Sequence, residues 1–317
     1  MSQGKEIKII CGNSNIPFAK SVCRNIGLRL SNSQVSTFSD GEIAVSLDDS
    51  VRGADVFIIQ STCTPINDNL MEMLIMVDAC KRASAHRVTC VMPYFGYARQ
   101  DRKVKARDPI SAKLVANLIV SAGTDRVLTM DLHAAQIQGF FDIPVDNLVG
   151  SPLFVDYFKQ KFKNKDDVMI VSPDIGSVAR ARAFAMRMNM ELAIIDKRRE
   201  KANQAEVMNI IGSVEGKRVI LFDDMVDTAG SLCEAAAALT EQGGAKEIYA
   251  CASHGVLSGK AIERIENSVV QEVIFSDTVP FTRAEPCSKI KYLTAAPLFA
   301  EAIKRIFEEV SISTIFR

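Results

Sequence analysis

The chain has 317 residues, 48% of them hydrophobic, and its 38 basic and 38 acidic residues give a formal net charge of zero. That length predicts about two domains of ~100–200 residues. The balanced charge excludes a global field able to hold a polyanion or an anionic membrane, so any anion site must be local. No segment approaches the ~20 apolar residues of a membrane span, and the amino terminus lacks a signal-peptide pattern, so we expect a cytoplasmic protein.

Short β-branched runs alternate with longer helical patterns along the first half of the chain. Strands are predicted at Ile7–Cys11, Val56–Gln60, Arg87–Met92 and Arg126–Met130, and helices at Phe18–Leu28, Asn67–Ala83 and Ile110–Ser121. The second half repeats this scheme. Its strands are predicted at Val168–Ser172, Glu191–Ile195, Val219–Asp223 and Glu247–Cys251, and its helices at Ser177–Met188 and Gly230–Gln242. Apolar strands between helices predict an α/β fold with parallel sheets covered on both faces.

The segment Asp146–Pro152 is rich in turn-forming residues and marks the predicted junction between the halves. We therefore expect two doubly wound parallel-sheet domains, residues 1–149 and 150–304, with the C-terminal segment 305–317 packing back on the first. The eight cysteines form no C-x-x-C pair, and there are only three histidines. This pattern argues against a zinc site and favours reduced, mostly buried thiols.

The most informative stretch follows the strand Val219–Asp223. It contains the acids Asp223 and Asp224 and then the loop Asp227-Thr228-Ala229-Gly230-Ser231, where a helix begins. Ligands of open parallel sheets bind beyond the carboxyl ends of strands, and a helix amino terminus with nearby hydroxyls suits a phosphate. Two acids beside a phosphate site need a reason, and a sugar phosphate supplies one, because its vicinal hydroxyls can donate to the carboxylates. The alternative is an acidic turn that merely caps a helix.

This stretch resembles the motif that binds 5-phosphoribosyl 1-diphosphate (PRPP) in the phosphoribosyltransferase superfamily. Five further segments separate makers of PRPP from consumers: Phe38–Glu42, Pro93–Arg102, Asp131–Phe141, Ser172–Gly176 and Asp196–Arg199. In this order they resemble the phosphate-activated class of the ribose-phosphate pyrophosphokinase family, and the resemblance covers essentially the whole chain. It implies two domains of phosphoribosyltransferase type, and transfer of the diphosphate of ATP to the C1 hydroxyl of ribose 5-phosphate, which requires Mg²⁺.

The resemblance also implies roles for individual residues. ATP would contact Phe38, Asp40, Glu42, Arg99, Gln100, Asp101 and His133, with Phe38 acting in a neighbouring subunit of a homo-oligomer, expected to be a hexamer built from dimers. The ribose 5-phosphate site would be formed by Asp223, Asp224, Asp227, Thr228, Ala229, Gly230 and Ser231. The diphosphate loop would be Asp174-Ile175-Gly176, and the metal would be held by His133 and Asp174.

Two basic residues would be catalytic. Lys197 and Arg199 are expected just past a strand end, where they could neutralise charge on the transferred phosphoryl group. The alternative is a solvated charged loop, which is our interpretation of Arg198, Glu200 and Lys201. The family pattern further implies an inhibitory ADP and activating phosphate site at a subunit interface, formed by Ser50, Arg52, Gln138, Asp146, Asn147, Ser311 and Ser313.

Some positions depart from the family pattern, and other functions compete with this one. Glu200 stands where proline is common, Gly255 follows His254 where proline is typical, and Phe222 precedes the acid pair. A phosphoribosyltransferase would consume PRPP without needing the Phe38 and Arg99 elements. A catalytically silent relative would not need Lys197. The basic run Arg99–Arg107 could bind single-stranded nucleic acid, but the zero net charge argues against such a partner.

Overall fold

The structure is a computed structural model that describes residues 6–164, 166–198, 207–281 and 287–316. Its internal contacts divide the chain into two compact units, which are described separately. The first contains Met1–Val149, Thr278–Pro280 and Thr294–Arg317, and the second contains Gly150–Asp277 and Phe281–Leu293. None of the helices in the described ranges has the length and apolarity needed to cross a membrane.

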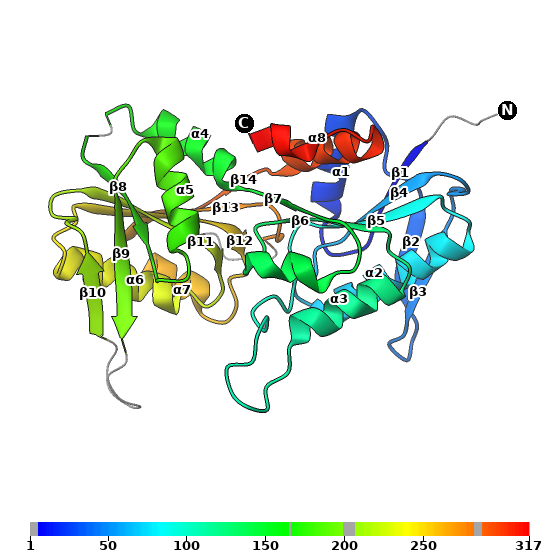
Figure 1. The fold of residues 1–317 in the computed structure, drawn as a ribbon, viewed down its shortest axis with the longest axis horizontal. Helices are drawn as coiled ribbons and strands as arrows, with labels where there is room; N and C mark the ends of the chain where they lie inside the picture. The colour runs from blue at the N-terminus through cyan, green and yellow to red at the C-terminus, as the bar shows by residue number, and fades with distance from the viewer. Residues whose placement is uncertain (1–5, 165, 199–206, 282–286, 317) are drawn as a thin grey trace. The chain divides into compact units, whose positions relative to one another are not determined.

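The first unit has a five-stranded parallel sheet. Its strands, in spatial order, are β1 (Ile7–Cys11), β4 (Asp55–Ile59), β5 (Arg87–Met92), β6 (Arg126–Met130) and β7 (Val145–Leu148). Helices cover both faces, with α2 (Ile66–Arg82) and α3 (Ser111–Ser121) on one, and α1 (Ile16–Ile26) and α8 (Ala296–Phe307) on the other (Figure 1). Two short 3₁₀ helices, η1 (Ala135–Phe140) and η2 (Ile312–Phe316), follow β6 and α8. The parallel strands and alternating helices confirm the predicted α/β class.

An antiparallel hairpin in the first unit was not predicted. It consists of β2 (Ser33–Thr37) and β3 (Ile43–Leu47), which pair with each other and form a separate two-stranded sheet. Its first strand gives a weak strand signal because Val35 is the only apolar residue of Ser33–Thr37. Val35 and Val45 nevertheless pack against the apolar core under α2 and hold the hairpin on the unit.

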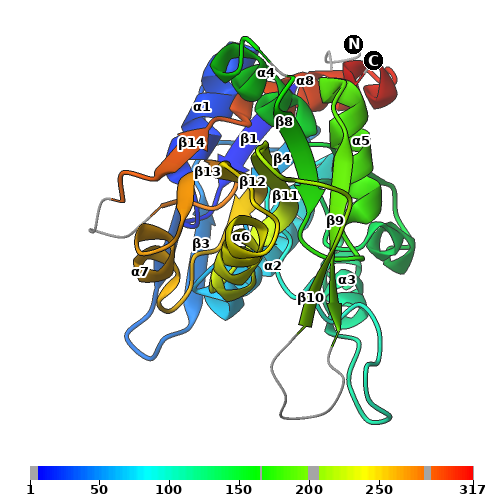
Figure 2. The same cartoon turned by 90° about the vertical axis from the view of Figure 1, so that its left-hand side faces the viewer.

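The second unit has a seven-stranded sheet. Its strands, in spatial order, are β10 (Val207–Ile211), β9 (Leu192–Arg198), β8 (Val168–Ser172), β11 (Arg218–Val226), β12 (Glu247–Gly255), β13 (Val270–Ser276) and β14 (Ile290–Leu293). All neighbours are parallel except β10, an edge strand that runs antiparallel to β9. Helices α4 (Ser151–Lys161) and α5 (Val178–Met188) cover one face, and α6 (Gly230–Glu241) and α7 (Ala261–Glu266) cover the other (Figure 2).

Strand β11 forms the centre of the second unit because its alternate side chains enter two different cores. Ile220 and Phe222 join the core under α4 and α5, where the rings of Phe222 and Phe184 stack with centroids 4.4 Å apart. Val219 and Leu221 join the core under α6 and α7. This alternation follows the two-residue period of a strand. By the same period, Asp224 faces the α5 side.

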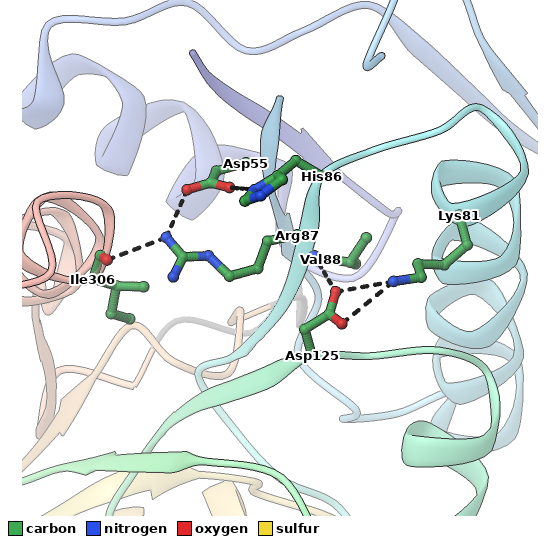
Figure 3. Close-up of polar contacts among 7 residues, drawn as sticks. All are labelled: Asp55, Lys81, His86, Arg87, Val88, Asp125 and Ile306. Carbon is green, nitrogen blue, oxygen red and sulfur yellow. Dashed lines mark hydrogen bonds and ion pairs between the residues drawn. The ribbon is translucent and has the colours of Figure 1, made fainter. Parts of the chain in front are cut away.

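The C-terminal helix α8 is fixed on the first unit by packing and by a buried ion pair. Phe299 of α8 meets Phe18 of α1 edge-on, with ring centroids 5.4 Å apart. At the carboxyl end of α8, Arg87 Nη2 donates to the carbonyl oxygen of Ile306 (3.3 Å) and pairs with Asp55 Oδ2 (2.6 Å; Figure 3). Asp55 is almost fully buried, so its pairing with Arg87 offsets the cost of removing the carboxylate from water.

All eight cysteines lie within the described ranges and none is bonded to another, as predicted. Seven are buried, and Cys233 is partly buried. Burial raises the pKa of Cys63 to about 11, and burial also raises the pKa of Cys80 to about 12. These thiols are therefore protonated and unreactive at neutral pH, and act as small apolar core residues.

Candidate active site

The acid pair lies within β11. This strand continues to Val226, beyond the end predicted at Asp223. Its pairing with β8 stops at Leu221 opposite Val171, whereas its pairing with β12 continues to Val226. Pairing on one side only leaves Asp223 and Asp224 beyond the carboxyl end of β8, at the edge where open parallel sheets bind ligands.

Two residues from the start of α5 hold the acid pair. Arg180 Nη1 lies 2.7 Å from Asp224 Oδ1 and 3.5 Å from Asp223 Oδ1. Ser177 Oγ donates to Asp223 Oδ1 (2.8 Å). The Asp224 side chain is 4% exposed and that of Asp223 is 27% exposed. Asp224 is thus an enclosed, paired carboxylate, and Asp223 is the more accessible one.

The environment of Asp223 favours its protonated form. Burial, together with repulsion from the neighbouring Asp224 carboxylate, raises the pKa of Asp223 to about 7, although the Ser177 hydroxyl opposes this by donating a hydrogen bond. Near neutral pH the Asp223 carboxyl is therefore about half protonated. Hydroxyl donors from a ligand would favour the ionised form, as any hydrogen bond to a carboxylate does.

The loop Asp227–Ser231 contains a strained residue at the start of α6. Ala229 precedes that helix with φ 58°, a left-handed conformation that residues with a Cβ rarely adopt. Thr228 and Ser231 are exposed at the amino end of the helix. The loop therefore presents hydroxyl groups at the amino end of a helix, the combination that suits a phosphate.

Two residues that follow β12 in the sequence hold this loop in place through their side chains. Ser258 Oγ donates to Asp227 Oδ1, and Arg264 Nη1 of α7 donates to the carbonyl oxygen of Thr228 (2.8 Å). A Cβ added at Gly230 would lie 3.7 Å from Arg264 Nη1, an ordinary contact distance. Gly230 is therefore not required for space on the guanidinium side of the loop.

The predicted diphosphate loop follows β8. Ser172 Oγ donates to the carbonyl oxygen of Asp174 (2.7 Å), and the backbone N–H of Ser177 donates to Asp174 Oδ1 (2.8 Å). A Cβ added at Gly176 would lie 3.2 Å from Asp174 Oδ1, which is tighter than a usual contact. Ile175 is 64% exposed. The loop is thus tied to its own strand and helix and presents backbone at its tip.

The prediction that Lys197 lies past a strand end was wrong. Strand β9 continues to Arg198, and Lys197 pairs with Met208 of β10. The antiparallel edge strand β10, which was not predicted, extends β9 by supplying backbone partners. Arg199, Glu200 and Lys201 lie outside the described residues.

In the first unit, the loops after β5 and β6 are joined by side chains. Gln136 Nε2, at the start of η1, donates to Asp101 Oδ2 (2.7 Å). Ser111 Oγ, at the start of α3, donates to Gln100 Oε1. Because β5 and β6 are neighbouring parallel strands, the residues after their carboxyl ends share one edge of the sheet. The sequence-predicted Asp101 and His133 segments are therefore brought together, and Gln136, which was missed, connects them.

Both loops contain backbone in the left-handed region. Tyr97 has φ 63° and Asp131 has φ 39°. The β6 loop is held by β7, since the N–H of Asp131 donates to Leu148 O (2.9 Å) and the N–H of Leu132 to Asn147 Oδ1 (3.1 Å). These bonds present His133 as an exposed side chain at the edge of the sheet.

The Phe38 loop is the tip of the β2–β3 hairpin. The N–H of Phe38 donates to Glu42 O (2.7 Å), and the N–H of Glu42 donates to Asp40 Oδ1 (3.1 Å). Phe38 is 59% exposed. Figure 1 shows this hairpin tip well apart from the loop between β5 and α3 that contains Arg99. Within one chain, the structure therefore does not bring the two predicted adenine-binding elements together.

The predicted regulatory residues also fail to converge within one chain. Ser50 and Arg52 precede the amino end of β4, whereas Gln138 follows the carboxyl end of β6, and parallel strands place these ends at opposite edges of the sheet. Asp146 pairs with Arg126. The hydroxyls of Ser311 and Ser313, near the C-terminus, lie 2.8 Å apart and are both exposed.

No cluster of three or more His, Cys, Asp or Glu side chains able to hold a metal ion occurs in the described part of the chain. Mg²⁺ commonly keeps several waters and takes only one or two protein carboxylates together with substrate phosphates. Asp174 supplies such a carboxylate on the diphosphate loop. The residues present therefore fit a magnesium ion that arrives with a nucleotide, and do not fit a metal held by protein side chains alone.

Sequence reasoning missed Arg180 and Ser177, although one signal pointed to Arg180. It lies in the first turn of α5, where the helix dipole disfavours a cation. An arginine at such a position needs a nearby acid, and Asp224 is 44 residues away in sequence.

Comparison with known proteins identifies the family. Residues 7–123 match the model for the N-terminal domain of ribose phosphate pyrophosphokinase, and residues 199–317 match the phosphoribosyl synthetase-associated domain. The chain is 61% identical to the ribose-phosphate pyrophosphokinase of Caldanaerobacter subterraneus subsp. tengcongensis over 98% of both chains, and 58% identical to that of Clostridium tetani over 98% of both. The crystal structure of phosphoribosylpyrophosphate synthetase from Mycobacterium smegmatis superposes with a TM-score of 0.91 at 40% identity, covering 96% of this chain and 100% of that one.

Proposed function

Because the chain belongs to the ribose-phosphate pyrophosphokinase family, we propose how its residues carry out the reaction of that family. The enzyme transfers the diphosphate of ATP to ribose 5-phosphate, giving PRPP and AMP. The C1 hydroxyl oxygen forms a bond to the β-phosphorus, and the bond from that phosphorus to the oxygen bridging the α- and β-phosphates breaks. AMP is the leaving group, and the hydroxyl proton is lost.

The observation that supports the ribose site is the acid pair on β11 followed directly by the strained hydroxyl loop. Asp223 and Asp224 accept hydrogen bonds from the 2- and 3-hydroxyls of the ribose. The loop from Asp227 to Ser231 holds the 5-phosphate through backbone N–H groups and the hydroxyls of Thr228 and Ser231. The repulsion between adjacent acids would be costly without a ligand that donates hydrogen bonds.

Asp174, Ile175 and Gly176 hold the transferred diphosphate. Ile175 and Gly176 are exposed at the tip of this loop, and the Asp174 carboxylate accepts a hydrogen bond from the N–H of Ser177. Lys197 and Arg199 stabilise the negative charge that develops on the β-phosphoryl group during transfer. Lys197 lies on β9 and pairs with Met208 of β10. This position supports the proposed role, since strands fix a functional group better than loops do.

ATP is held by the first unit. Arg99 and Gln100, with Asp101 and His133, follow the carboxyl ends of β5 and β6, and the Gln136–Asp101 hydrogen bond supports the shared position of these loops. Phe38, Asp40 and Glu42 contact the adenine of a neighbouring subunit, an assignment supported by the separation of the hairpin tip from the Arg99 loop in Figure 1. The active enzyme is then at least a dimer, and the family pattern leads us to propose a hexamer.

Magnesium is the proposed cofactor. The family pattern assigns Asp174 and His133 to it, and His133 would act through a water or a phosphate oxygen. The ion supplies positive charge that screens the phosphates of ATP. Chelation by EDTA should abolish activity, and added Mg²⁺ should restore it. The eight unbridged thiols support a cytoplasmic location.

The regulatory site is proposed between subunits. Ser50 and Arg52 of one subunit, with Gln138, Asp146 and Asn147 of another, would bind phosphate or ADP, and Ser311 and Ser313 would complete the site. Gln138, past the carboxyl end of β6, lies opposite Ser50 and Arg52, which precede the amino end of β4, and this separation supports a site that needs two copies of the chain. Activity that does not depend on phosphate concentration in a phosphate-free buffer would count against this assignment.

The test of the catalytic assignment is Lys197→Ala. We expect kcat to fall by at least ~10²-fold, the usual cost of losing one transition-state donor. Lys163→Ala, which removes an exposed lysine elsewhere in the second unit, is the control and should leave kcat unchanged. AMP and PRPP are measured together, because ADP production would indicate ordinary kinase chemistry. Near-normal turnover of the Lys197 variant would remove Lys197 from this role.

A subunit-mixing experiment tests the adenine assignment. Phe38→Ala and Arg99→Ala should each be nearly inactive. After the two variants are dissociated and reassembled together, mixed oligomers should recover part of the activity, because one interface then contains both intact residues. No recovery in oligomers shown to be mixed would place Phe38 and Arg99 in the same chain's site, or in no common site.

A further inference from the structure

Arg180 stands at an unfavourable position in its own helix, and no residue of the same helical turn offsets the cost. It lies in the first turn of α5, and no acidic residue occurs in that turn. Exposed N–H groups make this end of a helix positive, so a guanidinium there is disfavoured. Its side chain turns toward β11 and reaches both acids through one nitrogen, Nη1, at 2.7 Å from Asp224 Oδ1 and 3.5 Å from Asp223 Oδ1.

The acid pair in turn depends on Arg180. Asp224 is almost fully enclosed, and an enclosed carboxylate is tolerated only when it is paired. The Asp223 oxygen Oδ1 accepts two hydrogen bonds, from Ser177 Oγ (2.8 Å) and from the N–H of Asp224 (2.9 Å). The same oxygen forms an ion pair with Arg180 Nη1 (3.5 Å). Arg180 is thus the cation that contacts both neighbouring carboxyl groups and holds them in one geometry.

The residues at the start of α5 also fix the position of the diphosphate loop. The N–H of Ser177 is bonded to Asp174 Oδ1 (2.8 Å), while its hydroxyl is bonded to Asp223 Oδ1 (2.8 Å). Arg180 lies three residues further on, in the first turn of α5. Residues 177–180 therefore link the loop proposed to hold the diphosphate to the carboxylates proposed to hold the ribose hydroxyls. Displacement of this helix start would change the position of the ribose relative to the diphosphate.

We infer that Arg180 is a positioning residue for ribose 5-phosphate: it holds Asp223 and Asp224 in the orientation that accepts the ribose hydroxyls, with Ser177 as its auxiliary. The inference rests on the proposed role of the acid pair. Arg180 acts through the carboxylates and makes no contact with the substrate. Ribose 5-phosphate binding depends on it, and ATP binding does not.

Two variants and one control test this. Arg180→Met removes the charge and keeps much of the side-chain length, and should raise the KM for ribose 5-phosphate at least about tenfold, the equivalent of one charge-assisted hydrogen bond. The KM for ATP should change less than about twofold by the same conversion. Arg180→Lys, which keeps a cation, should recover most of the loss. Arg182→Met, on the same helix with an exposed side chain, should behave as the wild type. Thermal melting of each variant checks that it is folded.

A double-mutant comparison separates positioning from direct contact. If Arg180 acts through Asp224, adding Arg180→Met to Asp224→Asn should raise the KM for ribose 5-phosphate by less than about twofold over Asp224→Asn alone. Multiplicative effects would mean that Arg180 binds the substrate itself, and would overturn the inference. A normal KM in Arg180→Met beside a raised KM in Asp224→Asn would also overturn it, but would leave the ribose site intact. A normal KM in Asp224→Asn would overturn both.

Discussion

Replacement of Asp223 by asparagine should make the folded protein more stable at neutral and alkaline pH. The carboxylate lies beside Asp224 and is largely removed from water, and burial raises its pKa to about 7. Asparagine has nearly the same shape, keeps an oxygen that can accept from Ser177, and has no charge to repel Asp224. The substitution thus relieves a cost that we attribute to ribose binding.

The magnitude follows from the shift in pKa. A change from 3.8 to about 7 corresponds to about 4 kcal/mol when the unfolded chain titrates normally. Arg180, 3.5 Å from Asp223 Oδ1, offsets part of the repulsion between the acids. We therefore expect a gain of about 1–3 kcal/mol above pH 7, or about 2–10 °C in melting temperature for a domain of this size.

The sign of the pH dependence is fixed by linkage. Because the folded-state pKa is raised, the folded protein retains a proton that the unfolded chain has lost between about pH 4 and pH 7. The Asp223 carboxyl therefore contributes to the free energy of unfolding of the wild type in acid, and this contribution is lost as the pH rises through about 7. The asparagine of the variant does not titrate. The difference in melting temperature between the variant and the wild type should be near zero below the unfolded pKa of 3.8, and should grow to a plateau by about pH 8.

A second aspartate supplies a control of opposite sign. Hydrogen bonds from Arg218 lower the pKa of Asp167. Asp167→Asn should therefore be less stable than the wild type at neutral pH, and this loss should disappear in acid. Melting curves of the three proteins over the same buffers give both comparisons. A difference for Asp223→Asn that is constant with pH, or largest in acid, would refute the account of the acid pair.

Two further substitutions test the packing of the second unit. Burial opposes ionisation of Glu272, but hydrogen bonds from Lys291, Tyr157 and Lys161 lower its pKa overall. Glu272→Gln should therefore lower the free energy of unfolding by about 1–3 kcal/mol at neutral pH. Urea titrations at several pH values should show that this loss disappears as the pH falls below about 4. Gly255→Ala should cost about 1–3 kcal/mol, because the added Cβ would lie 2.9 Å from Phe275 Cγ, and Phe275→Leu in the same chain should restore part of the loss in a melting experiment.

The sequence predicted the buried strands well because their signal is local. Runs such as Val168–Ser172 and Arg87–Met92 are buried along nearly their whole length and have the predicted bounds. The family, the α/β class and the reaction were also predicted and are confirmed. The roles of the individual site residues remain predictions. The hairpin β2–β3 was missed because Ser33–Thr37 has only one apolar residue, and its position depends on packing against α2.

Strand ends were the least predictable feature, because distant partners determine them. β11 continues to Val226 only because β12 supplies backbone partners that far. Likewise, β9 includes Lys197 because β10 pairs with it. The contact of Arg180 with the acids joins residues 44 apart in sequence, and no local pattern specifies it. The chemistry of the site was thus evident in single motifs, whereas its geometry depended on contacts between them.

The distribution of backbone strain supports a functional role for the edges of both sheets. Seven described residues other than glycine have positive φ. Three of them follow helices, where such residues commonly end a helix: Ser84, Asn189 and Glu309. The other four lie just after the carboxyl ends of strands β5, β6, β11 and β12: Tyr97, Asp131, Ala229 and Leu257. Each such residue costs about 1–3 kcal/mol, and folding alone gives no reason to place them at these edges. We propose that nucleotide binding on the loops of Arg99 and His133 is the reason for the strain at Tyr97 and Asp131, as the proposed ribose 5-phosphate site would be the reason for the strain at Ala229.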